Sequence, residues 1–145
     1  MARPAGPKTR CNGLWTEAKF NSFIKNQLRA ASRKWAPINT CKKKAWVRRG
    51  VYKCGCCGEE VPLTVQNGKK RQNNVFVDHI DPVVPVEGWI DWDSCINRMF
   101  CEEDELQLIC KECHDEKSKE EAAQRAFFRA ERKVVGASER DAGPK

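Results

Sequence analysis

The chain has 145 residues and a formal net charge of +7; with 32% charged and 40% hydrophobic residues it can build one modest core, which excludes a fully disordered protein. Its uncharged stretches are far shorter than the roughly 20 residues of a membrane-spanning helix, so no membrane association is expected. The first ten residues, MARPAGPKTR, are followed by no apolar run, so they do not form a secretory signal, and the expected location is the cytoplasm.

The first predicted element is a helix over about 16–34, which follows a loose tail with Pro and Gly at 1–13. Thr16 can cap the start of this helix, and Pro37 prevents its continuation. The prediction rests on apolar residues that recur at intervals of three and four, as they do on one face of a helix: Phe20, Phe23, Ile24, Leu28, Ala31 and Trp35.

A second, shorter helix is predicted over about 41–49, with Thr40 as its cap and Gly50 at its end. Aromatic side chains contribute large packing surfaces. We therefore expect Trp35 and Trp46 to pack these two helices against each other.

Residues 1–53, which contain both helices, are strongly basic. They hold 14 Lys and Arg and a single acid, Glu17, a balance of +13, whereas residues 54–145 hold 13 basic and 19 acidic residues, a balance of −6. Clustered cations bind phosphates by releasing condensed counterions, so the basic segment predicts a nucleic-acid partner; a merely solvated helical face is the alternative. The side chains expected to bind DNA are Lys42, Lys43, Lys44, Arg48 and Arg49.

Short strands and turns are predicted next. Residues 51–52 form a strand that leads into Cys54, Gly58 closes a tight turn, and residues 61–65 return as a second strand. Residues 66–74 are polar with a basic centre, and they are expected to form a loop.

The rest of the chain alternates between short strands and helices. In order, we expect a strand over 75–77, an extended segment with prolines, a helix over 92–100 capped by Asp91, an acidic turn over 102–105 and a strand over 106–109. A final helix is predicted from about His114 to Val134, followed by a polar tail from Gly136.

The nine cysteines are interpreted first as metal ligands, because disulfides rarely persist in the cytosol. Cys54 and Cys57 form one C-x-x-C pair, Cys110 and Cys113 form another, and each pair follows a predicted strand. Two pairs with matched spacing predict a four-sulfur tetrahedral site for structural zinc. Cys56 could replace Cys57 as a ligand, although C-x-C matches the second pair less well.

A redox role is the alternative for these pairs, but a redox C-x-x-C normally stands alone near a βαβ pattern, which this sequence lacks. The cysteines that fit no pairing are expected to be ordinary small apolar residues. They are Cys11, Cys41, Cys95 and Cys101.

The two histidines lie at predicted element boundaries. His79 follows Asp78 at the end of a strand, and His114 directly follows the second cysteine pair. A histidine with a carboxylate suits a divalent metal, and a further free imidazole suits a general base. Spacing alone leaves open both catalysis and a purely DNA-binding protein that is held together by zinc.

Two segments together resemble the HNH endonucleases: VDHIDP at 77–82 and LQLICKECHDEK at 106–117. The preceding pair Cys54 and Cys57, with Gly58, is similar to the zinc-bearing branch of that family. The resemblance covers about residues 51–120. The small size and the basic helical arm are similar to those of phage-encoded members, for which the location would be the host cytoplasm.

The resemblance implies a ββα-metal core, in which two antiparallel strands and a helix surround one catalytic divalent cation such as Mg²⁺, with Zn²⁺ as a separate structural ion. His79 would be the general base that activates water, and Asp78 and His114 would hold the catalytic metal. The metal would contact the scissile phosphate and stabilise the leaving 3′ oxygen. This role requires a neutral His79, whose other ring nitrogen must be held by a further group.

The sequence departs from the family pattern at the middle asparagine, which usually directly precedes the LQ stretch. Glu105 occupies that position, and the nearest asparagine is Asn97, 17 residues before His114. Asn97 across an altered loop, Glu105, or a backbone carbonyl could therefore hold His79. A plain surface residue and an ordinary turn acid are the alternative interpretations of Asn97 and Glu105.

The sequence thus predicts a small α+β protein with three parts: a basic helical DNA-binding arm at 1–50, an HNH core with its zinc site at 51–134 and a flexible tail at 135–145. Its predicted function is metal-dependent phosphodiester hydrolysis in DNA, by nicking or double-strand cleavage. No small-molecule substrate is expected. The alternative is a zinc-containing DNA-binding protein without cleavage activity.

Overall fold

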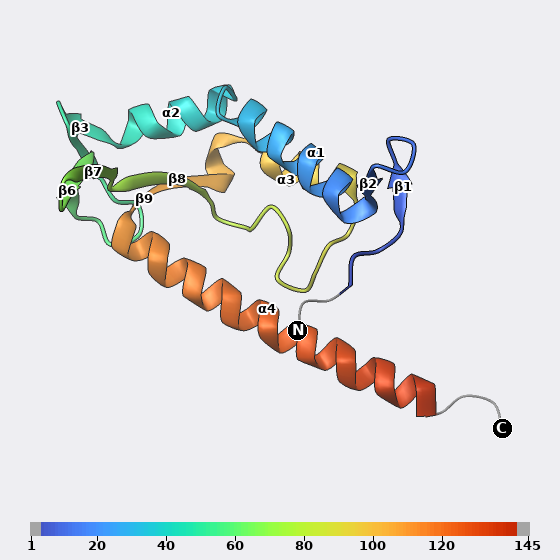
Figure 1. Ribbon diagram of the computed structural model, residues 1–145. Coiled ribbons are helices and arrows are strands. Elements are labelled where there is room, and N and C mark those ends of the chain that lie inside the picture. The colour runs from blue at the N-terminus through green and yellow to red at the C-terminus, as the bar shows by residue number, and fades with distance from the viewer. Residues whose placement is uncertain (1–3, 142–145) are drawn as a thin grey trace. The chain divides into compact units, whose positions relative to one another are not determined.

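A computed structural model describes residues 4–141 of the chain, and for residues 137–141 it describes the backbone alone. The chain divides into two compact units, Met1–Trp35 and Ala36–Lys145. Figure 1 follows the elements from blue at the N-terminus to red at the C-terminus. No helix in the described part of the chain is long and apolar enough to span a membrane.

The first unit contains a strand pair and one helix. Strand β1 (Lys8–Arg10) pairs antiparallel with β2 (Trp15–Thr16), and α1 spans Glu17–Ser32. The Thr16 hydroxyl accepts a hydrogen bond from the backbone N–H of Lys19 at 3.1 Å, which satisfies one of the free N–H groups at the helix start. The predicted helix and its cap are therefore confirmed.

The loose tail predicted at 1–13 is wrong for β1, because hydrogen bonds tie this strand to the start of α1. The Glu17 carboxylate accepts hydrogen bonds from the Thr9 hydroxyl at 2.8 Å and from Arg10 Nε at 2.9 Å. Cys11, in the turn between the strands, has φ +54° and is exposed, so it does not behave as a small apolar residue. The first three residues of the predicted tail lie outside the described residues.

The second unit begins with α2 (Ala36–Ala45), which runs directly into strand β3 (Trp46–Arg48). The helix predicted over 41–49 is therefore wrong at both ends. Pro37 lies in the first turn of α2, where a backbone N–H has no helical partner, so it does not prevent this helix. The helix ends where β3 starts to pair with the next strand.

Two residues of this segment differ from their predicted roles. Thr40 lies inside α2, where its hydroxyl donates to the carbonyl oxygen of Ala36 at 3.1 Å, so it is not the cap. Trp46 lies in β3 with 54% of its surface exposed, so it is not part of a helix as predicted.

Strands β3, β4 (Val51–Lys53) and β5 (Glu60–Pro62) form a three-stranded antiparallel sheet with β4 in the middle. The strand predicted over 61–65 is split at Leu63. The N–H of Leu63 donates to the carbonyl oxygen of Gly50 at 2.8 Å, and its own carbonyl accepts from Asn74. The chain therefore leaves this sheet after β5.

The polar loop predicted at 66–74 is wrong, because this segment forms most of a hairpin. Strand β6 (Thr64–Asn67) pairs antiparallel with β7 (Lys70–Asn73). Gly68 has φ +62° at the first central position of the two-residue turn, a conformation that favours glycine and suits hairpin twist.

The last two strands and the last helix form one continuous ββα motif. Strand β8 (Val75–His79) pairs antiparallel with β9 (Leu106–Cys110), so that Asp78 lies opposite Gln107. Helix α4 (Lys111–Asp141) begins directly after β9. Figure 1 shows β8 and β9 side by side, with α4 leaving from the end of β9.

The limits of α4 differ from those predicted. The helix begins at Lys111, before His114, directly after Cys110 at the end of β9, so its first turn contains Cys113. It also continues past Gly136, where a polar tail was expected, to Asp141. The last four residues of that predicted tail lie outside the described residues.

Between β8 and β9 the chain forms α3 (Trp92–Met99) and a short 3-10 turn (Glu103–Glu105), as predicted. The Asp91 side chain caps α3 by accepting from the N–H of Ser94 at 2.7 Å. The extended segment before α3 is held by arginines, whose guanidinium groups donate to its backbone carbonyls: Arg98 to Pro82, Arg125 to Val84 and Pro85, and Arg132 to Glu87.

The main core of the second unit lies where α2 covers the β8–β9 pair. Its buried members are Cys41, Val75, Cys101, Leu106 and Leu108. With Cys95, which is also buried, the cysteines of α2, α3 and the following loop behave as the small apolar residues that were predicted. The described part of the chain is thus a mixed α+β structure with four helices and small antiparallel sheets.

Candidate metal centre and active site

Four cysteines come together at one end of the β8–β9 pair, as their spacing predicts. The sulfurs of Cys54, Cys57, Cys110 and Cys113 all lie within 4.8 Å of one another. Two of them follow β4, and the other two lie at the end of β9 and in the first turn of α4. Cys56 is not among these four, which favours Cys57, and with it the C-x-x-C pair, as the ligand.

Backbone N–H groups surround the sulfur of Cys54, which is 1% exposed. The N–H groups of Cys56, Cys57 and Cys110 lie 3.4, 3.5 and 3.3 Å from it. Burial of the Cys54 thiol opposes its ionisation, but these N–H donors outweigh burial and lower its pKa to about 6. Cys54 is therefore prepared to act as a thiolate near neutral pH.

The Cys113 thiol responds to the same crowding in the opposite direction. The pKa of Cys113 is raised well above its usual range, mainly because its thiol hydrogen-bonds to the sulfur of Cys110, and burial adds to the effect. A divalent cation at the centre would replace these protons with metal–sulfur bonds. The donor set of four clustered sulfurs, one already favoured as thiolate, therefore fits a metal ion such as Zn²⁺.

Two glycines shape the first cysteine turn. A Cβ atom on Gly55 would lie 3.2 Å from the carbonyl oxygen of Leu108, to which the Gly55 N–H donates at 2.7 Å. Gly58 has φ +74°, and its N–H closes the turn on the carbonyl oxygen of Cys54 at 3.0 Å, as predicted. The glycines thus let the turn lie against β9, beside the second cysteine pair.

Asp78 lies on the face of β8 that α4 covers, and its carboxylate already has a cationic partner. The Lys117 ammonium group donates to Asp78 Oδ2 and to the backbone oxygen of His79. The same ammonium lies 3.3 Å from Glu121 Oε1, and Gln107 Nε2 donates to Asp78 Oδ2 at 3.4 Å. The end of β8 therefore presents a group of oxygen atoms that binds a positive charge.

His114 is placed over the same face of β8 by the first turns of α4. Its ring stacks on Phe76, with centroids 4.6 Å apart and an interplanar angle of 27°. Phe76 and Asp78 are two residues apart on a strand, so they share a face, and Lys117 lies about one helical turn beyond His114. The structure thus brings Asp78 and His114 to one side of β8, as proposed metal ligands must be.

His79 projects toward the other face of β8, because side chains alternate along a strand. Its Nε2 lies 2.9 Å from the carbonyl oxygen of Met99, the last residue of α3. A carbonyl oxygen only accepts hydrogen bonds, so Nε2 carries the proton and, in the neutral ring, Nδ1 keeps its lone pair. Asn97, Glu105 and a backbone carbonyl were the three groups expected to hold His79. Of these, a backbone carbonyl lies within hydrogen-bond distance of the ring.

Asn97 and Glu105, the two candidates for the family's middle asparagine, lie elsewhere. Both are exposed, and both line a small hollow of about 260 Å³ that Asp81 also borders. The Glu105 carboxylate accepts from the N–H of Glu102 at 3.2 Å, and its carbonyl oxygen accepts from Ile80 at 3.0 Å. Glu105 therefore stabilises the acidic turn and connects it to the end of β8.

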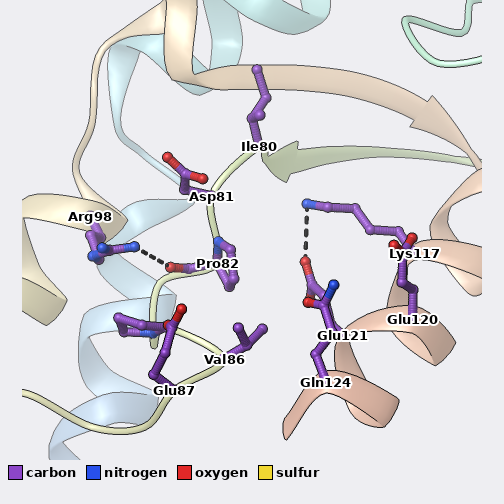
Figure 2. A pocket seen from close by; sticks show the side chains of 11 residues that line it. Ile80, Asp81, Pro82, Val86, Glu87, Arg98, Lys117, Glu120, Glu121 and Gln124 are labelled. Atoms are coloured by element: carbon purple, nitrogen blue, oxygen red, sulfur yellow. Dashed lines mark hydrogen bonds and ion pairs between the residues drawn. The ribbon is translucent and has the colours of Figure 1, made fainter. Parts of the chain in front are cut away.

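A second hollow, of about 400 Å³, opens beside Lys117 between the extended segment and α4 (Figure 2). Figure 2 shows Lys117 pointing toward Glu121, and Arg98 reaching the carbonyl oxygen of Pro82. This hollow has two basic side chains, those of Arg98 and Lys117. They are outnumbered by four acids: Asp81, Glu87, Glu120 and Glu121. Its charge therefore favours cations over phosphate groups.

The basic residues predicted to bind DNA are exposed, but two of them already have acidic partners. Lys44 Nζ lies 2.6 Å from Glu103 Oε1, and Arg48 is paired with Glu60 at 3.0 Å. The others are Lys42, Lys43 and Arg49, and none of them forms an ion pair within the described residues. These three keep their full charge for an external partner.

Sequence reasoning missed three contributors to the site: Lys117, Gln107 and the Met99 carbonyl. The i, i+3 spacing of His114 and Lys117 could have indicated that Lys117 reaches the same face of β8. The other two depend on strand register and on the position of α3. No family model, curated protein or solved structure matches the chain, so the candidate site rests on its own residues and geometry.

Proposed function

We propose that the protein is a metal-dependent DNA endonuclease of the HNH type, with a structural zinc ion on its four clustered cysteines. The observation that supports this most is the placement of Asp78 and His114 over one face of β8, within a ββα motif whose end carries the cysteine cluster. A carboxylate and an imidazole are a suitable donor pair for a catalytic divalent cation.

In this proposal Asp78 and His114 would hold the catalytic cation. A bound Mg²⁺ would supply Lewis-acid stabilisation of the negative charge that develops at the scissile phosphate. Because the Lys117 ammonium engages Asp78, a cation on Asp78 would share that carboxylate with Lys117 or displace it. The carboxylate and the carbonyl oxygen that now hold Lys117 give this position affinity for positive charge.

The proposed general base is His79, acting through Nδ1. The Met99 carbonyl oxygen accepts a hydrogen bond from the Nε2–H group, which fixes the tautomer of the neutral ring and orients it. The lone pair on Nδ1 can then take a proton from the attacking water. A backbone carbonyl can perform this orienting task without an asparagine at the position of Glu105.

The alternative function is a zinc-containing DNA-binding protein that does not cleave. The specific observation in its favour is the ion pair between Asp78 and Lys117, which neutralises the carboxylate without a metal. The exposed lysines and arginines of α2 and β3 would serve either function.

A nicking assay separates the two functions. Incubation of supercoiled plasmid with the protein and Mg²⁺ is expected to give nicked or linear DNA, and omission of Mg²⁺ should stop the reaction. The Asp78→Ala variant should lose this activity while it retains zinc, which excludes a contaminating nuclease. Equal conversion by Asp78→Ala and wild type, or no conversion by wild type at any Mg²⁺ concentration, would contradict the nuclease proposal.

Replacement of Lys42, Lys43 and Lys44 by Ala should weaken DNA binding about equally across sequences. Each lost phosphate contact lowers the slope of the binding constant against salt concentration by about 0.9. The triple variant should lose up to about three such contacts, and the slope should fall accordingly. Lys44→Ala alone should have the smallest effect of the three single variants, because Lys44 is paired with Glu103. Binding titrations at several salt concentrations measure the slope, and an unaltered slope would mean that the lysines are a solvated face.

A further inference from the structure

Two aromatic residues, one exposed and one half-buried, form a pair on the three-stranded sheet. Trp46 in β3 and Tyr52 in β4 are directly opposite each other in the antiparallel register. Directly opposed residues have their side chains on the same face of the sheet. Tyr52 also packs against the buried core, whereas Trp46 keeps 54% of its surface exposed and belongs to neither buried cluster.

The pair lines a hollow of about 540 Å³ together with residues of α2. The other lining residues are Asn39, Lys42 and Lys43. The Lys42 ammonium lies 5.8 Å from the centre of the Tyr52 ring. The hollow is thus walled by flat aromatic surfaces, with two positive charges at its edge and one amide group, and its volume lies in the range of small-molecule sites.

The lysines at this hollow differ from two neighbouring basic residues that have acidic partners. Lys44 is paired with Glu103, and Arg48 is paired with Glu60. Lys42 and Lys43 take part in no ion pair of the described residues. The hollow therefore carries two unpaired positive charges beside its aromatic rings, which favours an anionic ligand over a cationic one.

We propose that this hollow binds an unpaired base of a DNA strand, stacked on Trp46, with the flanking phosphates on Lys42 and Lys43. A nucleotide combines the two features that the hollow matches, a planar ring and a negative charge, and proteins bind single strands by this combination. The Asn39 amide can donate to and accept from the edge of a base. Bases in an intact duplex are stacked on their neighbours, so their faces are not available to the indole.

This inference rests on the proposed function only in taking DNA as the partner. It adds that the preferred DNA has unpaired bases near the protein, as in a single strand, a bulge or a frayed end. Phosphate contacts alone would give similar binding to single and double strands that carry similar charge.

The test compares binding of a fluorescein-labelled oligodeoxythymidylate and of a duplex of the same length. It uses the full chain with Asp78→Ala, so that the DNA is not cleaved. Added Trp46→Ala should weaken single-strand binding by about 5- to 150-fold, the usual effect of one lost stacking residue, and should leave duplex binding nearly unchanged. Trp46→Phe should retain most of the single-strand affinity, because a phenyl ring also stacks.

Trp89→Ala is the matched control, since Trp89 is 43% exposed but lines no part of the hollow. It should change neither affinity. Oligodeoxythymidylate should also quench tryptophan fluorescence in the Asp78→Ala protein, and the quenching should shrink in Trp46→Phe; this readout needs no alanine variant to fold. Thymidine monophosphate, with one phosphate, should compete weakly.

Equal losses for single strand and duplex, no loss in Trp46→Ala, or an equal loss in Trp89→Ala would overturn the inference. Competition by thymidine monophosphate as strong as that of the oligonucleotide would replace the DNA strand with a free nucleotide and would also overturn it. The nuclease proposal is judged separately. If the protein does not nick plasmid but Trp46→Ala shows the selective loss of single-strand binding, this inference stands. If the protein nicks plasmid and Trp46→Ala shows no such loss, this inference is wrong.

Discussion

Substitution of Cys54 by Ser is expected to unfold the core of the second unit and to abolish zinc binding, which is the largest effect we predict for a single residue. Cys54 is almost fully buried, and its sulfur accepts hydrogen bonds from three backbone N–H groups. Structural zinc binding is largely folding free energy, on the order of 10 kcal/mol in small sites. That amount is comparable to the whole stability of a domain, about 5–15 kcal/mol.

The measurements are the zinc content of the purified protein and its thermal unfolding by circular dichroism. Wild type should contain close to one zinc per chain without added catalytic metal, and Cys110→Ser should behave like Cys54→Ser. Cys56→Ser is the matched control, because Cys56 lies within the same turn but outside the sulfur cluster. A zinc-free preparation that unfolds in a normal cooperative transition would disprove the structural role of the metal.

The cysteine cluster could be predicted because each of its halves is a local feature. A C-x-x-C turn with a glycine after it has few alternative conformations, and the matched spacing of the second pair supplies the partner. Helix α1 and the caps of α1 and α3 were predictable for the same reason. Thr16 and Asp91 accept hydrogen bonds from N–H groups three residues away, so each cap is defined by residues that are close together in the sequence.

The hairpin of β6 and β7 and the limits of α2 could not be predicted by apolar periodicity. Strand β7 is exposed at every position, so it has no alternation to detect. The remaining signal was Gly68 in a two-residue turn between polar runs. Helix α2 ends at Ala45 because β3 pairs with β4, and such pairing depends on residues beyond the helix.

The candidate site was predictable in its residues but not in its contacts. The positions of Asp78, His79 and His114 beside a strand end and a cysteine pair indicate them as site residues. The partners of His79 and Asp78, the Met99 carbonyl and Lys117, lie 20 and 39 residues away along the chain. Only the packing of α3 and α4 beside β8 brings them together, and no local pattern encodes that packing.

His79→Ala and His114→Ala are expected to impair DNA cleavage in different ways, because the two imidazole rings have different surroundings. His79→Ala should retain DNA binding and zinc but lose on the order of 10² to 10⁴ in cleavage rate, the usual contribution of a general base. Plasmid nicking under single-turnover conditions measures the cleavage rate, and the zinc content and a DNA-binding titration of the same variant are the controls.

His114→Ala should instead weaken the affinity for the catalytic metal, so part of the activity should return at high Mg²⁺ or Mn²⁺. His114 also stacks on Phe76, so His114→Phe is the control that keeps a ring on this face of β8 but removes the ligand nitrogen. Metal rescue in both His114 variants, and none in His79→Ala, would assign ligand and base as proposed. If His79→Ala cleaves at the wild-type rate, the active-site assignment is wrong, and DNA binding without cleavage becomes the better account of the fold.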